Sequence, residues 1–213
     1  MPIKIVFLDC DGTLTKVKSS WEFLHRRLGL WNNHADLYQR LFREGKIDYH
    51  EFCRRDALLW KGLRVADVLD VVRGIPYQEG VKEAIRSLKG MGITTFIVST
   101  GLSALVDLVR AELAIDGAVS NELLSKDGVL TGEVRINVEY DRKGALIDAM
   151  LDRSGLNRKD ACAVGDGEGD IGMFEAVGLP IGFNPHDKVL PHIKHACFGS
   201  SLADIVDIVR DCG

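Results

Sequence analysis

The sequence contains no apolar run long enough to cross a membrane. Its longest stretch without a charged residue covers residues 90–106, and glycine, serine and threonine interrupt it. A membrane-spanning helix needs about 20 consecutive, mostly apolar residues, so we expect no membrane segment. The apolar run at residues 3–8 is too short for the core of a secretory signal, and no small-residue cleavage site follows it. We therefore expect a cytoplasmic protein.

Paired cysteines and an excess of basic residues are also lacking. The five cysteines form no Cys-x-x-Cys pair, and their odd number disfavours a disulfide framework as well as a thiolate zinc site. Lysine and arginine number 27 against 31 aspartates and glutamates, which gives a formal charge of −4. Binding to nucleic acid or to an anionic membrane relies on a basic excess, so we expect neither as a partner.

The composition is that of an ordinary globular protein, with 46% hydrophobic and 27% charged residues in a chain of 213. Short apolar runs predict strands at residues 3–8, 93–98, 161–164 and 179–183. Amphipathic patterns predict helices at residues 79–91, 103–113, 143–154 and 202–210. This alternation predicts an α/β fold with a Rossmann-like, doubly wound parallel sheet and helices on both faces.

Two segments interrupt the alternation. An Asp-Gly pair between residues able to form strands predicts a small β-hairpin flap at residues 126–134. In residues 14–75 the strand signal disappears and amphipathic helices replace it, one of them beginning at Asp48. We therefore predict a core domain, residues 1–13 and 76–213, and an inserted helical cap. The insert carries 12 basic and 8 acidic residues, so it is either a set of solvated helix faces or a basic lid over an anionic ligand.

Two carboxylates follow the first predicted strand. Asp9 and Asp11 are two residues apart, so their side chains would leave an extended chain on the same side. Ligands of open α/β sheets bind at the carboxyl ends of the strands. Close carboxylates repel unless a shared proton or a metal ion neutralises them, and oxygen ligands suit Mg²⁺. An EF-hand fails because it needs glycine sixth and an acid twelfth, whereas Gly12 is fourth and Ser20 twelfth.

A second acidic cluster, residues 165–170, follows the strand predicted at residues 161–164. Asp166 stands just past that strand, as Asp9 does, so on neighbouring strands the two acids would approach one cation. The stretch also holds a Gly-x-Gly-x-x-Gly pattern with Asp187 twenty residues beyond its first glycine, so a dinucleotide-binding module is an alternative. Against it, the acids would crowd a pyrophosphate with negative charge.

Two further elements suit a phosphate group. Ser99, Thr100 and Gly101 follow an apolar run, and a hydroxyl with free N–H groups at a helix start could hold phosphate oxygens, although a plain helix cap fits as well. Lys143 opens another predicted helix, where the helix dipole disfavours a cation unless an anion lies close. The alternative for Lys143 is an ordinary surface lysine.

The order of these motifs resembles the haloacid dehalogenase superfamily, and specifically its phosphatases with a helical, C1-type cap after the first motif. Asp-x-Asp-Gly-Thr, an apolar strand ending in serine, a lysine and the last acidic cluster follow one another over 162 residues. The phrases EGKIDYHEF, KDGVLTGEV and VGDGEGDIGMFEAVGLPIGF are similar to those of the phosphoserine phosphatase family, and the resemblance covers nearly the whole chain.

The resemblance implies a role for each matching residue. Asp9 would be the nucleophile that forms an aspartyl-phosphate, and Asp11 the acid and base. Ser99 and Lys143 would hold the phosphate, the lysine balancing charge on the transferring phosphoryl group.

It also implies a metal cofactor, Mg²⁺. Asp9 and Asp166 would be its carboxylate ligands, with the backbone carbonyl of Asp11 as a third protein ligand. Asp170 would orient that shell.

The insert departs from the phosphoserine phosphatase pattern. By ungapped reading, Lys18 stands where that family has a glutamate for the substrate ammonium, and Asp56 where it has an arginine for the carboxylate. A lysine cannot accept a hydrogen bond from an ammonium, so we expect altered substrate residues. The candidates in the insert are Lys18, Trp21, Tyr49, Arg54 and Arg55, with core packing as the alternative for the two aromatic residues.

These observations predict a Mg²⁺-dependent phosphomonoester hydrolase that acts on a small phosphorylated metabolite, as a monomer or homodimer. The enzyme alternative is a phosphomutase or phosphotransferase of the same superfamily. The alternative that is not an enzyme is the dinucleotide-binding module.

Overall fold

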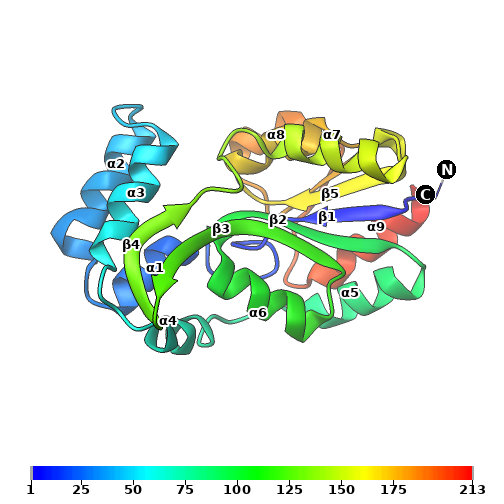
Figure 1. Ribbon diagram of the computed structural model, residues 1–213. Coiled ribbons are helices and arrows are strands. Elements are labelled where there is room, and N and C mark those ends of the chain that lie inside the picture. The colour runs from blue at the N-terminus through cyan, green and yellow to red at the C-terminus, as the bar shows by residue number, and fades with distance from the viewer. Residues whose placement is uncertain (1, 213) are drawn as a thin grey trace.

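A central sheet organises the computed structural model, which describes residues 2–212 (Figure 1). Within these residues the sheet has seven strands in the order β4-β3-β2-β1-β5-β6-β7, all parallel to their neighbours except β4. The strands are β1 (Ile5–Leu8), β2 (Thr94–Leu102), β3 (Gly117–Lys126), β4 (Val129–Arg135), β5 (Ala161–Gly165), β6 (Leu179–Phe183) and β7 (His195–Cys197). The predicted α/β fold is confirmed. The chain adds β2, β3 and β4 on one side of β1 and then β5, β6 and β7 on the other. Open α/β sheets bind ligands at such a switch point.

Some strand residues lie outside the predicted runs. β7 is a three-residue edge strand, and β3 begins with Gly117 and Ala118, so neither starts with the β-branched pattern that predicts a strand. β2 continues past its predicted end to Leu102. The strand signal in the sequence therefore gives the centre of the sheet better than its edges.

Helices cover both faces of the sheet. Successive side chains of a strand point to opposite faces, and the apolar residues on each face are buried against helices. Val6 and Leu8 of β1 belong to the core on the side of α5, α6 and α9, and Ile5 and Phe7 to the core on the side of α7 and α8 (Figure 1). These helices are α5 (Val81–Gly90), α6 (Ser103–Leu113), α7 (Lys143–Ser154), α8 (Ile171–Glu175) and α9 (Ile205–Asp211). Short 3₁₀ turns cover Arg158–Asp160, Glu168–Asp170, Asp187–His192 and Leu202–Asp204. The predicted doubly wound arrangement is confirmed.

The segment between β1 and α5 is helical, as predicted. It forms α1 (Ser20–Arg27), a π-helical turn (Trp31–Ala35), α2 (Asp36–Arg43), α3 (Tyr49–Leu59) and α4 (Val65–Val72). α3 begins after Asp48, whose carboxylate accepts a hydrogen bond from the backbone N of Glu51 at 2.7 Å. The aromatic residues of this helical segment form a separate hydrophobic core together with Leu102 and Leu130. None of the helices in the described part of the chain combines the length and apolarity needed to cross a bilayer.

β3 and β4 form the predicted hairpin, which joins the sheet edge to the insert. β3 pairs first with β2 and then, further along, with β4. Three backbone hydrogen bonds tie the hairpin to residues 62–65, which connect α3 to the first residue of α4. Gly62 N donates to Leu130 O at 2.9 Å, Leu130 N to Leu63 O at 2.8 Å, and Val65 N to Gly128 O at 2.9 Å. The hairpin is therefore continuous with both parts of the molecule.

Candidate active site

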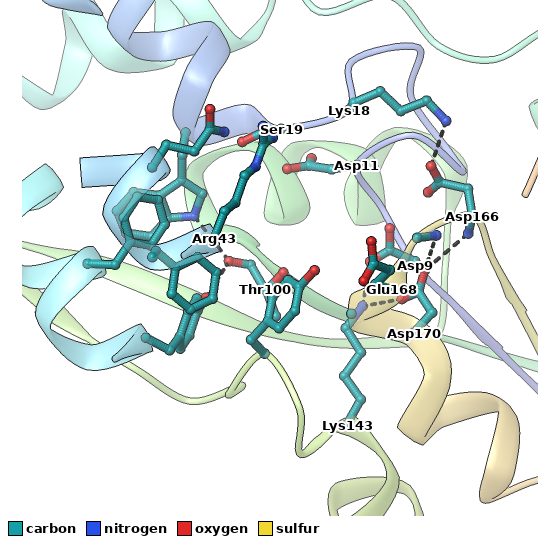
Figure 2. Close-up of a pocket in the computed structure, with 18 residues that line it drawn as sticks. Asp9, Asp11, Lys18, Ser19, Arg43, Thr100, Lys143, Asp166, Glu168 and Asp170 are labelled. Atoms are coloured by element: carbon teal, nitrogen blue, oxygen red, sulfur yellow. Dashed lines mark hydrogen bonds and ion pairs between the residues drawn. The ribbon is translucent and has the colours of Figure 1, made fainter. Parts of the chain in front are cut away.

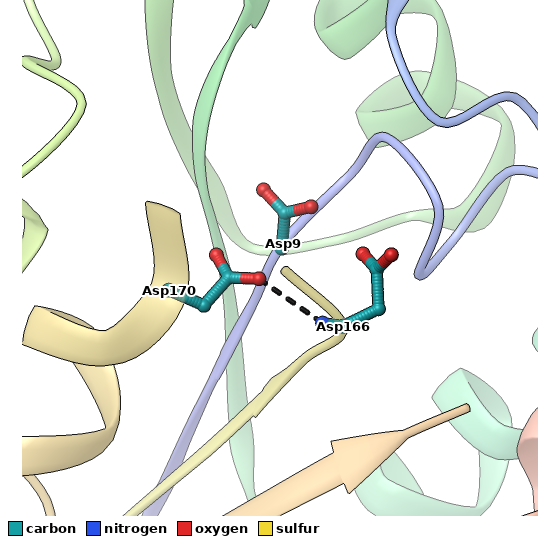
Figure 3. Close-up of side chains that lie close together, drawn as sticks. All are labelled: Asp9, Asp166 and Asp170. Atoms are coloured by element: carbon teal, nitrogen blue, oxygen red, sulfur yellow. Dashed lines mark hydrogen bonds between the residues drawn. The ribbon is translucent and has the colours of Figure 1, made fainter. Parts of the chain in front are cut away.

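Three aspartates meet where β1 and β5 end (Figure 3). β1 and β5 are parallel neighbours, and Asp9 and Asp166 each follow the last residue of a strand. Asp170 reaches the same place from the 3₁₀ turn that follows β5. One carboxylate oxygen of each aspartate lies within 4.8 Å of the others, and all three residues are buried. The structure thus brings together the two strand-end acids that the sequence placed near one cation.

Lys143 supplies a buried positive charge to this cluster. Its Nζ lies 2.7 Å from Asp9 Oδ1 and 2.6 Å from Asp170 Oδ1, and the residue is 1% exposed. Burial raises the pKa of Asp9 well above its usual value and Asp170 adds to this, while Lys143 opposes both. Burial alone would lower the pKa of the Lys143 amine, but Asp170 and Asp9 more than offset it and the net pKa is raised. The lysine is therefore a charged member of the site and not a surface residue.

Asp170 and a glycine shape the loops around Asp166. Asp170 Oδ2 accepts hydrogen bonds from the backbone N of Asp166 and of Gly167, both at 3.0 Å. Gly12 packs against the Asp166 carboxylate with φ at 87°, and a Cβ at this position would lie 2.6 Å from the carboxylate oxygens. Only glycine meets both demands, a left-handed backbone and a close approach.

Asp11 lines the same cavity but has different neighbours. Its Oδ2 accepts hydrogen bonds from the backbone N of Ser20 at 2.6 Å and from Ser20 Oγ at 2.7 Å. Its Oδ1 is buried and has no hydrogen-bond partner among the described residues. Burial raises the pKa of Asp11, and the two hydrogen bonds from Ser20 partly oppose the rise. The two aspartates of the first motif therefore differ in environment, one beside an ammonium and the other beside a hydroxyl.

Lys18 approaches the acidic cluster from the opposite side to Lys143 (Figure 2). Its Nζ lies 2.6 Å from Asp166 Oδ2, and Thr13 Oγ1 donates to Asp166 Oδ1 at 3.2 Å. The Lys18 side chain is 64% exposed, so this ion pair is solvated. Burial raises the pKa of Asp166, and Lys18 is the largest influence that opposes it. The lysine thus pairs with an acid of the cluster, a role that the sequence did not predict.

Ser99, Thr100 and Gly101 continue β2, and α6 begins only at Ser103. Ser99 is buried and its Oγ accepts a hydrogen bond from Gly101 N at 3.0 Å. Thr100 is the one of the three that lines the cavity. The expected helix start therefore lies further along the chain, and the Gly101 amide already has a partner.

The insert closes the far side of the cavity, which measures about 230 Å³. Trp21 and Tyr49, both predicted, line it and donate hydrogen bonds to Thr100 O at 3.1 and 3.2 Å. The sequence did not predict five further residues of this wall, Gln39, Phe42, Arg43, Phe52 and Tyr140. Three of them lie at spacings of three and four on α2 and so share one face of that helix. That spacing is the signal that could have revealed them.

The other predicted insert residues lie elsewhere. Arg54 and Arg55 both pair with Glu51 on the same helix, at 2.9 and 2.7 Å, and neither lines the cavity. Asp56 is buried inside the insert, with Oδ2 3.3 Å from His25 Nε2. Arg43 thus takes the place near the cavity that we expected of Arg54 or Arg55.

Known proteins resemble the chain in sequence and in structure. A family model for haloacid dehalogenase-like hydrolases matches residues 6–175. The chain is 33% identical over 181 residues to a phosphoserine phosphatase of Methanocaldococcus jannaschii, covering 84% of this chain and 85% of that protein. It is 32% identical over 208 residues to one of Archaeoglobus fulgidus, covering 97% of this chain but only 60% of that protein. A solved substrate-bound phosphoserine phosphatase complex superposes with a TM-score of 0.85 at 28% identity, covering 98% of this chain and 99% of that one.

Proposed function

The chain belongs to the haloacid dehalogenase-like hydrolase family, and from that premise we propose that it is a Mg²⁺-dependent phosphomonoester hydrolase that works through an aspartyl-phosphate. Its similarity to several phosphoserine phosphatases identifies it as a phosphatase. One observation carries the mechanism: the Asp9 carboxylate lies beside a buried ammonium and two more carboxylates at one end of a cavity. That arrangement suits nucleophilic attack on a phosphoryl group, with positive charge available to its oxygens.

The acidic cluster fits a hard divalent cation. Three carboxylates share one buried place, and within residues 2–212 their ion-pair partners are Lys143 and the solvated Lys18. Oxygen ligands of this kind suit Mg²⁺, which would neutralise the carboxylates and the phosphate oxygens. Asp9 and Asp166 would hold the ion with the Asp11 carbonyl, and Asp170 would orient them through its hydrogen bonds to the loop.

Asp9 would act as the nucleophile. An Asp9 oxygen forms a bond to phosphorus while the bond from phosphorus to the alcohol oxygen breaks. Lys143, held between Asp9 and Asp170, places its charge beside the transferring group without having to move. Water then attacks the aspartyl-phosphate, inorganic phosphate leaves, and the Asp9 carboxylate is restored.

Asp11 would move the protons. Burial raises its pKa, which favours the protonated acid needed to protonate the departing alkoxide. Ser20 occupies Oδ2 with two hydrogen bonds, so the unpartnered Oδ1 is the oxygen that would carry the proton. After the alcohol leaves, the Asp11 carboxylate takes a proton from the attacking water. The same residue thus serves as acid in the first step and as base in the second.

Residues 14–75 would act as a cap. They supply Lys18 from the loop before α1, Trp21 from α1 and side chains of α2 to the cavity, so the reacting phosphate lies between this segment and the sheet. A cap that covers the site excludes bulk water during transfer. The cavity volume of about 230 Å³ suits a small phosphorylated metabolite as substrate.

Phosphate release from a panel of phosphomonoesters, with Mg²⁺ or with EDTA, tests the proposal. We expect Asp9→Asn to lower kcat by at least about a thousandfold, because loss of a covalent nucleophile has effects of this size. Asp207→Asn, an exposed aspartate on α9, serves as the control and should keep full activity. A variant at Asp9 with normal turnover, or turnover that EDTA leaves unchanged, would contradict the proposal.

A further inference from the structure

The cavity wall opposite the acidic cluster is aromatic. Phe42 stacks on Phe52 with ring centroids 5.1 Å apart and meets Tyr140 edge-on at 5.3 Å. Tyr49 lies 5.8 Å from Phe42 and 6.1 Å from Tyr140, and Trp21 lies 6.3 Å from Phe52. All five line the cavity, so an alcohol group bound there would meet a continuous aromatic surface.

The polar atoms of two of these aromatic residues, Trp21 and Tyr49, already have hydrogen-bond partners. Trp21 Nε1 and the Tyr49 hydroxyl both donate to Thr100 O, and Asn121 Nδ2 donates to the Tyr49 hydroxyl at 2.8 Å. These hydrogen bonds fix both rings from behind. What the two rings present to a bound group is therefore chiefly apolar area, which favours a flat or apolar alcohol over a small polar one.

The charge on this side of the cavity is positive. Arg43 lines it (Figure 2). Within residues 2–212, other arginines have ion pairs with acidic side chains but Arg43 has none. Besides the acidic cluster, two acids line the cavity: Asp11 accepts two hydrogen bonds from Ser20, and Glu168 is paired with Lys188 at 3.1 Å. Among the described residues, the aromatic wall offers a substrate ammonium no carboxylate, whereas a substrate anion would find Arg43.

We propose that this site selects phosphomonoesters whose alcohol carries an apolar or aromatic body with an anionic group, and rejects those with an ammonium. The proposal rests on the phosphohydrolase function proposed above and specifies its substrate class. Arg43 would bind the anionic group of the substrate, and the aromatic wall around Phe42 would contact the apolar part of its alcohol.

Three benzyl phosphates that differ only at the para position test the charge preference, because they share one leaving alkoxide. They are benzyl phosphate, 4-carboxybenzyl phosphate and 4-(aminomethyl)benzyl phosphate. We expect kcat/KM to be highest for the carboxylate and lowest for the ammonium. Arg43→Gln should lower the ratio of carboxylate to uncharged substrate about fivefold, the size expected for a partly solvated ion pair. Arg40→Gln, an exposed arginine on the same helix outside the cavity, should leave that ratio unchanged.

Ethyl phosphate tests the aromatic wall. We expect benzyl phosphate to have the higher kcat/KM, and Phe42→Leu to reduce this advantage. A general folding defect would lower both rates together and leave their ratio unchanged. The charge inference is overturned if the ammonium ester is the best substrate or if Arg43→Gln leaves the carboxylate preference intact. Failure to hydrolyse every ester, the uncharged one included, would instead refute the phosphohydrolase function itself.

Discussion

Replacing Lys143 with methionine is expected to make the acidic cluster unstable without a metal. The ammonium is buried between Asp9 and Asp170 at 2.7 and 2.6 Å. Its loss leaves three buried carboxylates, whose remaining ion-pair partner in the described part of the chain is the solvated Lys18. Removing one partner of a buried ion pair costs about 3–5 kcal/mol. For a chain of this length each 1 kcal/mol moves Tm by about 2–4 °C, so we expect Lys143→Met to lose roughly 10 °C in EDTA.

The loss is expected to depend on pH. Without Lys143, the influence that lowers the pKa of Asp9 disappears and the pKa rises further. A carboxyl with a raised pKa in the folded state binds a proton on folding, so its stability contribution is present at low pH and is lost as pH rises through the folded pKa. The difference in Tm between Lys143→Met and wild type should therefore be small near pH 5 and largest near pH 8.

Thermal unfolding of both proteins at pH 5 and pH 8, with EDTA or Mg²⁺, measures these effects. Mg²⁺ should narrow the gap, because the variant presents more uncompensated negative charge to the cation. Lys188→Met, which removes an exposed partner of Glu168, is the control and should cost less than about 1 kcal/mol. A Tm for Lys143→Met within about 2 °C of the wild-type value at pH 8 in EDTA, a difference of at most about 1 kcal/mol, would refute the reasoning.

Three further predictions concern Lys18, Gly12 and Asp116. Lys18→Met removes the ammonium from Asp166 and should tighten Mg²⁺ binding by calorimetry about two- to fivefold, with unchanged affinity as the contrary result. Gly12→Ala should lower stability to denaturant by about 1–3 kcal/mol and impair metal binding, and wild-type values for both would contradict the close contact with Asp166. The pKa of Asp116 is lowered by Lys89 first and also by Thr95, so its stabilisation is present above the usual aspartate pKa and is lost as pH falls through the lowered value. Asp116→Asn should cost about 1 kcal/mol at pH 7 and little in acid, as urea titrations at both pH values would show.

The sequence predicted the bounds of two helices, α6 (Ser103–Leu113) and α7, although only α7 is followed by a glycine that signals its end. α7 runs from Lys143 to Ser154 as predicted, because Gly155 takes a left-handed φ of 63° and ends the helix. The helix predicted at residues 202–210 instead divides into a 3₁₀ turn and α9. β7 escaped prediction since three residues at a sheet edge offer too short a pattern.

In the site, the sequence could predict what the sheet alone determines. Asp9 and Asp166 follow strands that prove to be neighbours, so parallel pairing brings them together. The choice among arginines depended on tertiary structure. Arg54 and Arg55 have Glu51 three and four residues before them and pair with it, whereas Arg43 has no acid at those spacings and lines the cavity. That local difference is visible in the sequence, but which helix faces the cavity is not.

The hairpin links the edge of the sheet mechanically to the insert. β3 pairs with β2 at one end and with β4 at the other, and Gly128 and Leu130 form backbone hydrogen bonds with residues 62–65. If the helices of the insert move away from the sheet to admit substrate, one of two things must happen. Either these three backbone hydrogen bonds break, or the hairpin moves together with the helices. In the second case the pivot would lie near Asn121, where β3 leaves β2 and where the side chain also bonds Thr100 O. Substrate entry would then bend the sheet itself, and the stiffness of one strand would set how readily the site opens.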